Sequence, residues 1–77
     1  MTQFISLDGL EKLRKELDER ETVLRPEIAK RILEAKELGD LSENAEYAES
    51  REAQGMNESR IEEIKDAIKN AVIMGPN

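Results

Sequence analysis

Two carboxylates near the middle of the chain, Asp40 and Glu43, have the residue type and spacing to act together on a metal ion. They lie in a strongly acidic segment, residues 37–52, which holds six acids and a single base, Arg51. The full chain of 77 residues has 18 acidic and 12 basic residues and a formal net charge of -6. Nearly all of that net charge belongs to this segment. The remainder has the balanced, mixed-sign charge of solvated helices.

A separation of three residues at the start of a helix brings two side chains to the same side. Two such carboxylates can coordinate Mg²⁺, but they cannot fill its octahedral shell unless another macromolecule supplies further oxygens. A second interpretation needs no metal, because acids near a helix N-terminus are stabilised by the helix dipole and a charged run is usually a solvated face. The residue types alone favour this second interpretation. An EF-hand is excluded, because the segment lacks the glycine and the closing glutamate of such a loop.

The composition excludes several classes of function. The chain has no cysteine, histidine or tryptophan, and only one phenylalanine and one tyrosine. Thiolate and imidazole chemistry, disulfides and the usual zinc or haem ligands are therefore excluded, as is an aromatic platform for single-stranded nucleic acid. The acidic net charge argues against autonomous binding to nucleic-acid phosphates. With no apolar run of membrane-spanning length and no signal-peptide pattern, we expect a cytoplasmic protein without a membrane partner.

Helical periodicity predicts a first long helix over about residues 7–38. Ser6 is a good N-cap, and Asp8 lies in the first turn, where the helix dipole favours a carboxylate. Pro26 interrupts the pattern and predicts a kink or a brief break at Arg25–Pro26, because it removes a hydrogen bond and crowds the preceding turn. One apolar stripe runs along this helix, at Leu10, Leu13, Leu17, Leu24, Ile28, Ile32, Ala35 and Leu38.

A turn at the acidic segment then separates this helix from a second one. Gly39 is a natural left-handed residue after a helix end, so we place the turn at 39–42 and the second helix at about 43–73, with Ser42 as its cap. Residues 1–5 read as a short lead-in, and no strand is predicted. The core positions predicted for the second helix are alanines and a methionine near the turn and larger residues further on: Ala45, Ala48, Met56, Ile61, Ile64, Ile68 and Val72.

Two long helices joined by a tight turn run antiparallel. The predicted fold is therefore all-α, a long antiparallel two-helix coiled-coil hairpin with an acidic turn at its tip. Lys36 and Arg51 flank this tip, where they either contact a phosphate backbone or form surface ion pairs with Glu37, Glu49 or Glu52. Tyr47 is a candidate phosphate or base contact, or a cover for the thin alanine seam.

The segment from Gly39 to Tyr47, Gly-Asp-Leu-Ser-Glu-Asn-Ala-Glu-Tyr, resembles the tip motif of the bacterial transcript cleavage factors, the GreA/GreB family. Further agreement lies in residues 10–17, 25–28, 51–55 and 60–72, so the resemblance extends over essentially the whole chain. It is nearer to the GreA branch, since the GreB coiled coil is more basic. This resemblance reverses the preference stated above and favours a metal role for the tip acids.

The resemblance implies an N-terminal coiled-coil domain over residues 1–77, without the FKBP-like C-terminal domain of the family. Such a domain enters the secondary channel of RNA polymerase and stimulates the polymerase's own Mg²⁺-dependent cleavage of backtracked nascent RNA, which rescues arrested complexes. Asp40 and Glu43 match the two acids that help hold a second Mg²⁺ together with the polymerase. Lys36 and Arg51 match a basic patch that contacts the transcript, and Asn44 and Tyr47 are candidate contacts for RNA or polymerase.

Two other functions remain open at this point. One is a channel-blocking inhibitor of RNA polymerase with the same fold, which the residues between Asp40 and Glu43 disfavour because they add no further acid to the turn. The other is a plain coiled-coil interaction module without any metal. A stand-alone enzyme is the least favoured, because a narrow rod offers no pocket that excludes water, so the chain is expected to act as a cofactor of the polymerase. Weak self-association of the isolated domain is a further prediction.

Overall fold

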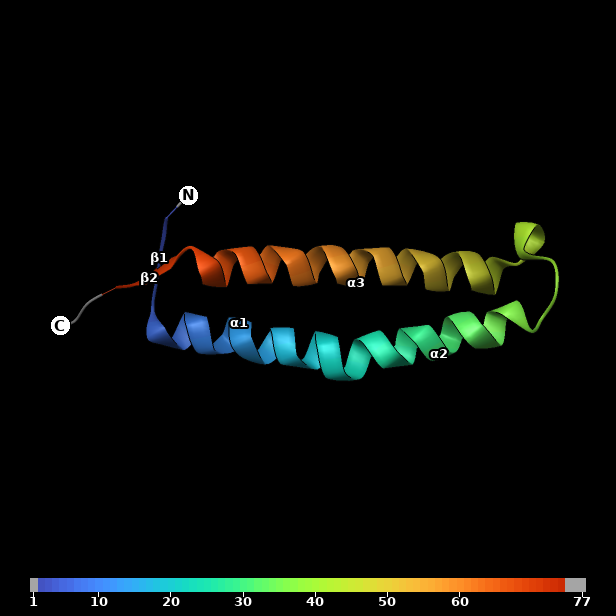
Figure 1. The fold of residues 1–77 in the computed structure, drawn as a ribbon, viewed down its shortest axis with the longest axis horizontal. Coiled ribbons are helices and arrows are strands. Elements are labelled where there is room, and N and C mark those ends of the chain that lie inside the picture. The colour runs from blue at the N-terminus through green and yellow to red at the C-terminus, as the bar shows by residue number, and fades with distance from the viewer. Residues whose placement is uncertain (1, 75–77) are drawn as a thin grey trace.

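Two helical arms run antiparallel along a rod with extents of 58 × 22 × 13 Å (Figure 1). The computed structural model describes residues 2–74. The first arm consists of α1 (Leu7–Glu19), a π-helical turn η1 (Arg20–Leu24) and α2 (Arg25–Lys36), and the second arm is α3 (Ala45–Lys69). A short 3-10 turn, η2 (Leu41–Glu43), lies between them at the tip. The predicted all-α helical hairpin is confirmed.

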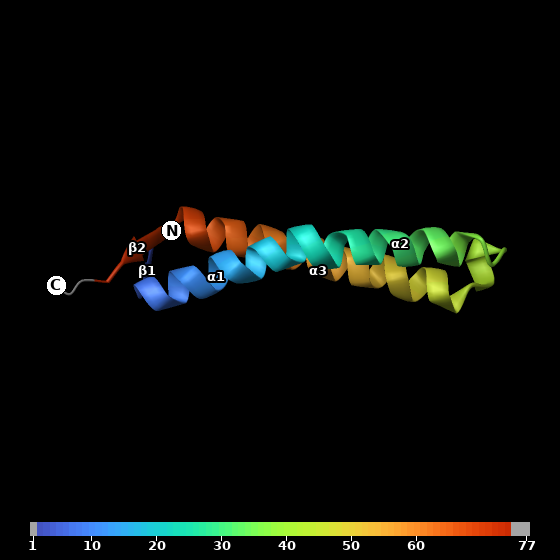
Figure 2. The same ribbon diagram turned by 90° about the horizontal axis from the view of Figure 1, so that it is seen from below.

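The first arm begins and bends where the sequence predicts. Ser6 caps α1, since its Oγ accepts a hydrogen bond of 3.0 Å from the backbone N–H of Gly9. Just before Pro26 the helix widens into η1, in which the N–H of Arg25 bonds to the carbonyl of Arg20, five residues back. A π-helical turn of this kind lets a helix continue past an irregularity in its hydrogen-bond ladder. In Figure 2 the first arm crosses α3 in projection near this turn.

The helix ends near the tip differ from the prediction. The first arm ends at Lys36 rather than at residue 38, and Gly39 then takes a positive φ of 120°, as expected for the residue that breaks the helix. The second arm begins at Ala45 rather than 43, and its cap is Asn44 instead of Ser42. The physical reason is that Ser42 is already held inside η2 by hydrogen bonds to Asp40.

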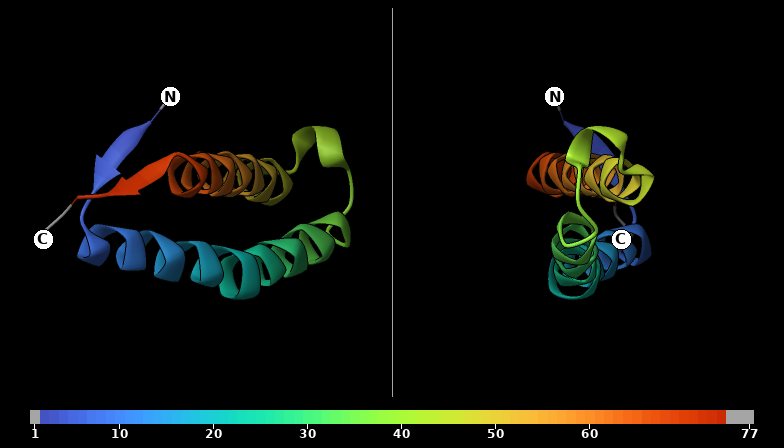
Figure 3. Two further views of the ribbon diagram at one scale, coloured as in Figure 1. Left: turned by 60° about the vertical axis from the view of Figure 1, so that its left-hand side comes forward. Right: turned by 90° about the vertical axis from the view of Figure 1, so that its right-hand side faces the viewer.

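The absence of strands was a wrong prediction. β1 (Gln3–Ile5) and β2 (Ala71–Ile73) form a two-stranded parallel sheet at the open end of the rod, with Phe4 opposite Val72. The second helix accordingly ends at Lys69, short of the predicted residue 73. Figure 3 shows that β1 runs toward the open end before the chain reverses into α1, whereas β2 continues α3 in the same direction. The sheet therefore ties both ends of the hairpin together.

The core runs along the seam between the arms. On the first arm the buried residues belong to the predicted stripe, and Leu13, Leu17 and Leu24 are half-buried, whereas Leu38 is 71% exposed and lies outside the core. On α3 the predicted positions near the tip are wrong, because Ala45 and Ala48 are exposed and Met56 is 68% exposed. The buried residues are Leu10, Ile28, Ile32 and Ala35 on the first arm and Ser50, Asn57, Ile61 and Ile64 on α3.

The seam of α3 follows a strict alternation of three- and four-residue steps. Starting from the buried Ile61 and Ile64, this alternation reaches Ile68 toward the open end, and Asn57, Gln54, Ser50 and Tyr47 toward the tip. All seven positions are buried or half-buried. Such spacing is the heptad pattern of a coiled coil. In the tip half of the rod the seam of α3 is thus made of polar side chains and Tyr47, and not of the predicted alanines.

Candidate functional site

The tip of the rod is formed by the connection between Lys36 and Ala45, from which η2 projects (Figure 3). Asp40 and Glu43 are both exposed there. Asp40 directly precedes the 3-10 turn, and Glu43 is the last residue of that turn. Asp40 is the cap of this turn: its Oδ1 accepts hydrogen bonds from the backbone N–H of Ser42 at 2.9 Å and from the Ser42 hydroxyl at 2.8 Å. These two hydrogen bonds lower the pKa of Asp40, so its carboxylate is ionised and oriented by its own turn.

The remaining carboxylate oxygens at the tip are available to a partner. Within residues 2–74, Oδ2 of Asp40 and both oxygens of Glu43 take part in no hydrogen bond or ion pair. Two exposed carboxylates fit a hard divalent cation such as Mg²⁺ in chemical type, although they supply only part of its ligand shell. In the described part of the chain no group of three or more acidic side chains gathers into a possible metal site.

Asn44 has a role that the sequence analysis missed. Its Oδ1 accepts a hydrogen bond of 3.1 Å from the backbone N–H of Tyr47, which caps α3. Its Nδ2 donates a hydrogen bond of 2.6 Å to the carbonyl of Ala35, near the end of α2. Through these two hydrogen bonds the amide of Asn44, a half-buried residue, bridges the two arms next to the acidic turn. Asparagine is as good an N-cap as serine, so the cap could have been predicted from the sequence. The bridge to Ala35 could not, because it joins residues of two different arms.

The other candidate contact residues lie around this tip. Lys36 is the exposed last residue of α2. Arg51 is exposed on α3 and donates from Nη1 to Oε1 of Gln54 at 3.0 Å. None of the ion pairs recorded for residues 2–74 joins either cation to Glu37, Glu49 or Glu52, so the predicted alternative of surface pairs is not realised. Tyr47 is half-buried at the tip end of the α3 seam.

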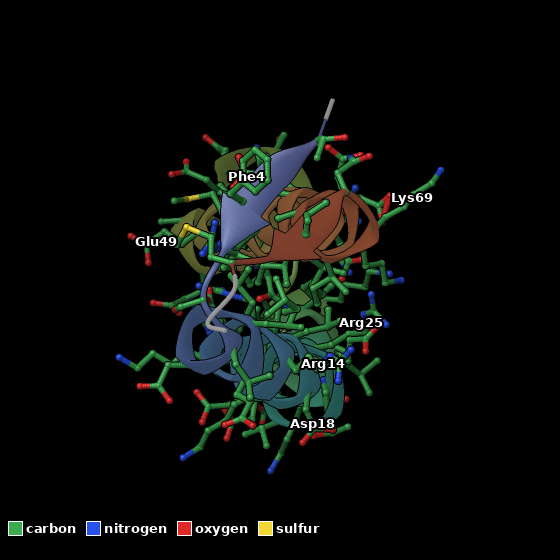
Figure 4. All side chains as sticks on the ribbon, turned by 90° about the vertical axis from the view of Figure 1, so that its left-hand side faces the viewer. Phe4, Arg14, Asp18, Arg25, Glu49 and Lys69 are labelled. Atoms are coloured by element: carbon green, nitrogen blue, oxygen red, sulfur yellow. The ribbon has the colours of Figure 1, made fainter. Side chains whose placement is uncertain are left out.

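The ion pairs of the described residues lie in the middle of the rod. Glu16 of α1 accepts from Arg20 and from Arg60, and these contacts lower its pKa to about 2. Arg25 bonds Glu58 through two hydrogen bonds of 2.8 and 2.9 Å, and Figure 4 shows Arg25 at the side of the rod, between the arms. Glu16 and Glu58 in the middle of the rod are thus paired with arginines, whereas Asp40 and Glu43 at the tip take part in no ion pair within residues 2–74. No helix within residues 2–74 is long and apolar enough to span a membrane.

Comparison with known proteins agrees with this architecture. A family model described as "Transcription elongation factor, N-terminal" matches residues 3–73. The chain is 52% identical over 75 residues to the transcription elongation factor GreA of Hamiltonella defensa, covering 96% of this chain and 48% of that protein. It is 53% identical over 70 residues to GreA of Haemophilus influenzae, covering 91% and 44%. The chain spans about half the length of the curated relatives it matches. It belongs to the GreA/GreB family of transcription elongation factors and corresponds to the N-terminal part of that family.

Proposed function

We propose that this chain inserts its coiled coil into the secondary channel of bacterial RNA polymerase and stimulates the polymerase's own Mg²⁺-dependent cleavage of backtracked RNA. Cleavage of the displaced RNA 3′ end returns an arrested complex to elongation. Membership of a family of transcription elongation factors supports a polymerase partner. The chain itself is not the enzyme in this proposal, because its exposed tip donates carboxylates to an active site that the polymerase completes.

One observation carries the proposal: two carboxylates with free oxygens are held at the end of a narrow rod. The rod is 58 Å long, and its other two extents are only 22 and 13 Å, so its tip can reach a site at the bottom of a channel. The acids at the middle of the rod, Glu16 and Glu58, are paired with arginines of the chain. Asp40 and Glu43 are left for a ligand outside the chain.

The roles of the tip residues follow from their contacts. Ser42 orients Asp40 through Oδ1 and leaves Oδ2 free, while Glu43 is exposed at the end of the same turn. Asp40 and Glu43 would hold a Mg²⁺ ion jointly with polymerase ligands, and that ion would supply the charge that activates a water for hydrolysis. Lys36 and Arg51 are exposed cations on either side of the tip, and in this proposal they contact the phosphates of the RNA.

The proposal is tested with a halted elongation complex that has been backtracked and carries RNA labelled at its 5′ end. Addition of this protein with Mg²⁺ is expected to shorten the RNA much faster than the polymerase does alone, and subsequent addition of nucleotides is expected to extend the shortened RNA. A channel-blocking inhibitor would instead slow nucleotide addition without any shortening. A plain interaction module would change neither rate. Either of these last two results contradicts the proposal.

A further inference from the structure

We propose that Asn44 is the positioning residue of the tip, which holds Asp40 and Glu43 in place by fastening the two arms together beneath them. This inference rests on the proposed function and adds to it the residue that sets the geometry of the two acids. It also changes the interpretation of Asn44, which the sequence presents as a candidate contact for RNA or polymerase.

The contacts of Asn44 use both ends of its amide. Nδ2 donates to the carbonyl of Ala35 on the first arm, and Oδ1 accepts from the N–H of Tyr47 on the second. Ala35 is only 3% exposed, so the carbonyl end of this bridge belongs to the packed core. A hydrogen bond anchored in the core fixes a direction as well as a distance, because both the donor and the acceptor are held by their own helices.

The rest of the hairpin offers no substitute for this bridge at the tip. The other hydrogen bonds and ion pairs between the arms within residues 2–74 lie nearer the open end, and the pair closest to the tip is Arg25 with Glu58. Between that pair and the turn, Asn44 makes the one hydrogen bond that joins the arms within residues 2–74, and the residues buried there include Ile28, Ile32 and Ser50. The relative placement of the two helix ends therefore depends on Asn44.

Both acids lie inside the loop that Asn44 closes. The bridge joins residues 35 and 44, and Asp40 and Glu43 fall between them. The loop is open to solvent: a Cβ atom built on Gly39 would meet no other atom within 4 Å. Its conformation is set by its closed ends and by the bonds between Asp40 and Ser42. Opening such a loop restores conformational freedom to the segment that carries the carboxylates.

The test replaces Asn44 by serine and uses Asn57→Ser as the matched control. Serine keeps an oxygen that caps α3 but removes the amide nitrogen that reaches Ala35. Asn57 is also an amide that bridges the arms, since its Nδ2 donates to the carbonyl of Arg20, but it lies far from the tip. Asn57→Ser removes two hydrogen bonds between the arms and Asn44→Ser removes one, so a larger loss of cleavage in Asn44→Ser at equal folded fraction reports the position of the bridge and not the loss of stability.

The readouts are the maximal rate of stimulated RNA cleavage, the half-saturating concentrations of the protein and of Mg²⁺, and NMR order parameters of the free protein. For Asn44→Ser we expect the maximal rate to fall by about 10- to 100-fold, because a small misplacement of a reacting group has effects of that size. The half-saturating Mg²⁺ concentration should rise, while that of the protein stays within about twofold. Order parameters should fall at residues 40–43. Asn57→Ser should leave the maximal rate and these order parameters unchanged.

Three results separate this inference from the proposed function. If the wild-type chain itself stimulates no cleavage, the proposed function is wrong. If the wild type is active and Asn44→Ser has the same maximal rate, Asn44 is not a positioning residue. The inference is likewise overturned if Asn57→Ser loses as much activity as Asn44→Ser at equal folded fraction. Should Asn44→Ser unfold at the assay temperature, Asn44→Asp keeps the cap, lacks the donor, and must show the same loss.

Discussion

Glu16 of α1 and Arg60 of α3 form a two-point contact across the rod, with Nε of Arg60 2.8 Å from Oε2 of Glu16 and Nη2 3.0 Å from Oε1. Arg20 adds a third hydrogen bond to the same carboxylate at 2.8 Å. Next to them the amide of Asn57 accepts from Arg20 Nη1 and donates to the Arg20 carbonyl in the π-helical turn. A polar cluster thus fixes the register of the two arms at the point where the first arm is irregular.

The first prediction concerns the pH dependence of stability through Glu16. The arginines lower the pKa of this carboxyl from 4.5 to about 2, so its stabilising contribution is present above about pH 4.5 and is lost as the pH falls toward 2. The Glu16 side chain is about a third exposed, and solvent screening limits the contribution to about 1 kcal/mol. Glu16→Gln should therefore lower the free energy of unfolding at neutral pH by that amount. Urea titrations should show the difference from wild type shrinking to zero near pH 2, and a constant difference would contradict the assignment.

The second prediction concerns Asn57, which is only 4% exposed. Asn57→Ser leaves the Arg20 carbonyl and one guanidinium N–H without their partner, which should cost about 1 to 3 kcal/mol. Thermal unfolding followed by circular dichroism measures this loss. A melting temperature equal to that of the wild type would mean that water replaces the amide without cost.

The third prediction uses the same substitution at two glycines. A Cβ added at either Gly39 or Gly55 meets no atom within 4 Å, so the two sites differ in backbone conformation alone. Gly39 has a φ of 120°, where alanine is strained, and Gly39→Ala should cost about 1 to 2 kcal/mol. Gly55 lies within α3, and Gly55→Ala should stabilise the helix by about 0.5 to 1 kcal/mol. Urea unfolding measures both free energies of unfolding. If the two substitutions change this free energy in the same direction, the backbone conformation described for Gly39 or for Gly55 is wrong.

The fourth prediction distinguishes the true seam of α3 from the predicted one. Ile64 is fully buried, so Ile64→Ala should cost about 2 to 5 kcal/mol and unfold much of this small protein at room temperature. Met56, which the sequence analysis placed in the core, is 68% exposed, and Met56→Ala should change stability by less than about 0.5 kcal/mol. Equal losses of helical signal from the two variants would restore the original core assignment.

The fold was predictable from the sequence wherever the spacing of apolar residues indicates which positions are buried. The stripe from Leu10 to Ala35 and the isoleucines of α3 define two facing helices, and Gly39 marks the turn. The tip half of α3 was mispredicted because its seam consists of Tyr47, Ser50, Gln54 and Asn57, which no apolar pattern reveals. Ile61, Ile64 and Ile68 are separated by alternating steps of three and four residues. Continuing the same steps toward the tip would have located these polar seam positions.

Other features depend on contacts between distant parts of the chain. β1 and β2 have three residues each and exist only because the hairpin brings Phe4 beside Val72, so neither segment carries a strand pattern of its own. At the candidate site, the exposed position of Asp40 and Glu43 followed from the acidic turn. The bridge from Asn44 to Ala35 did not, because it needs the two helix ends to meet in space. The metal and contact roles of the site residues stay predictions.

The central claim is that Asp40 and Glu43 act as individual carboxylates at the tip, and not through the net negative charge of the acidic segment 37–52. Its most direct test compares Asp40→Asn and Glu43→Gln with Glu49→Gln, which removes one negative charge from the same acidic segment, on the flank of α3 shown in Figure 4. On a backtracked elongation complex, each tip variant should lower the maximal rate of Mg²⁺-dependent RNA cleavage by about 100-fold or more, while competing with the wild type for the polymerase as well as before. Glu49→Gln should cleave at the wild-type rate. Wild-type cleavage by either tip variant, or an equal loss in Glu49→Gln, would contradict the account.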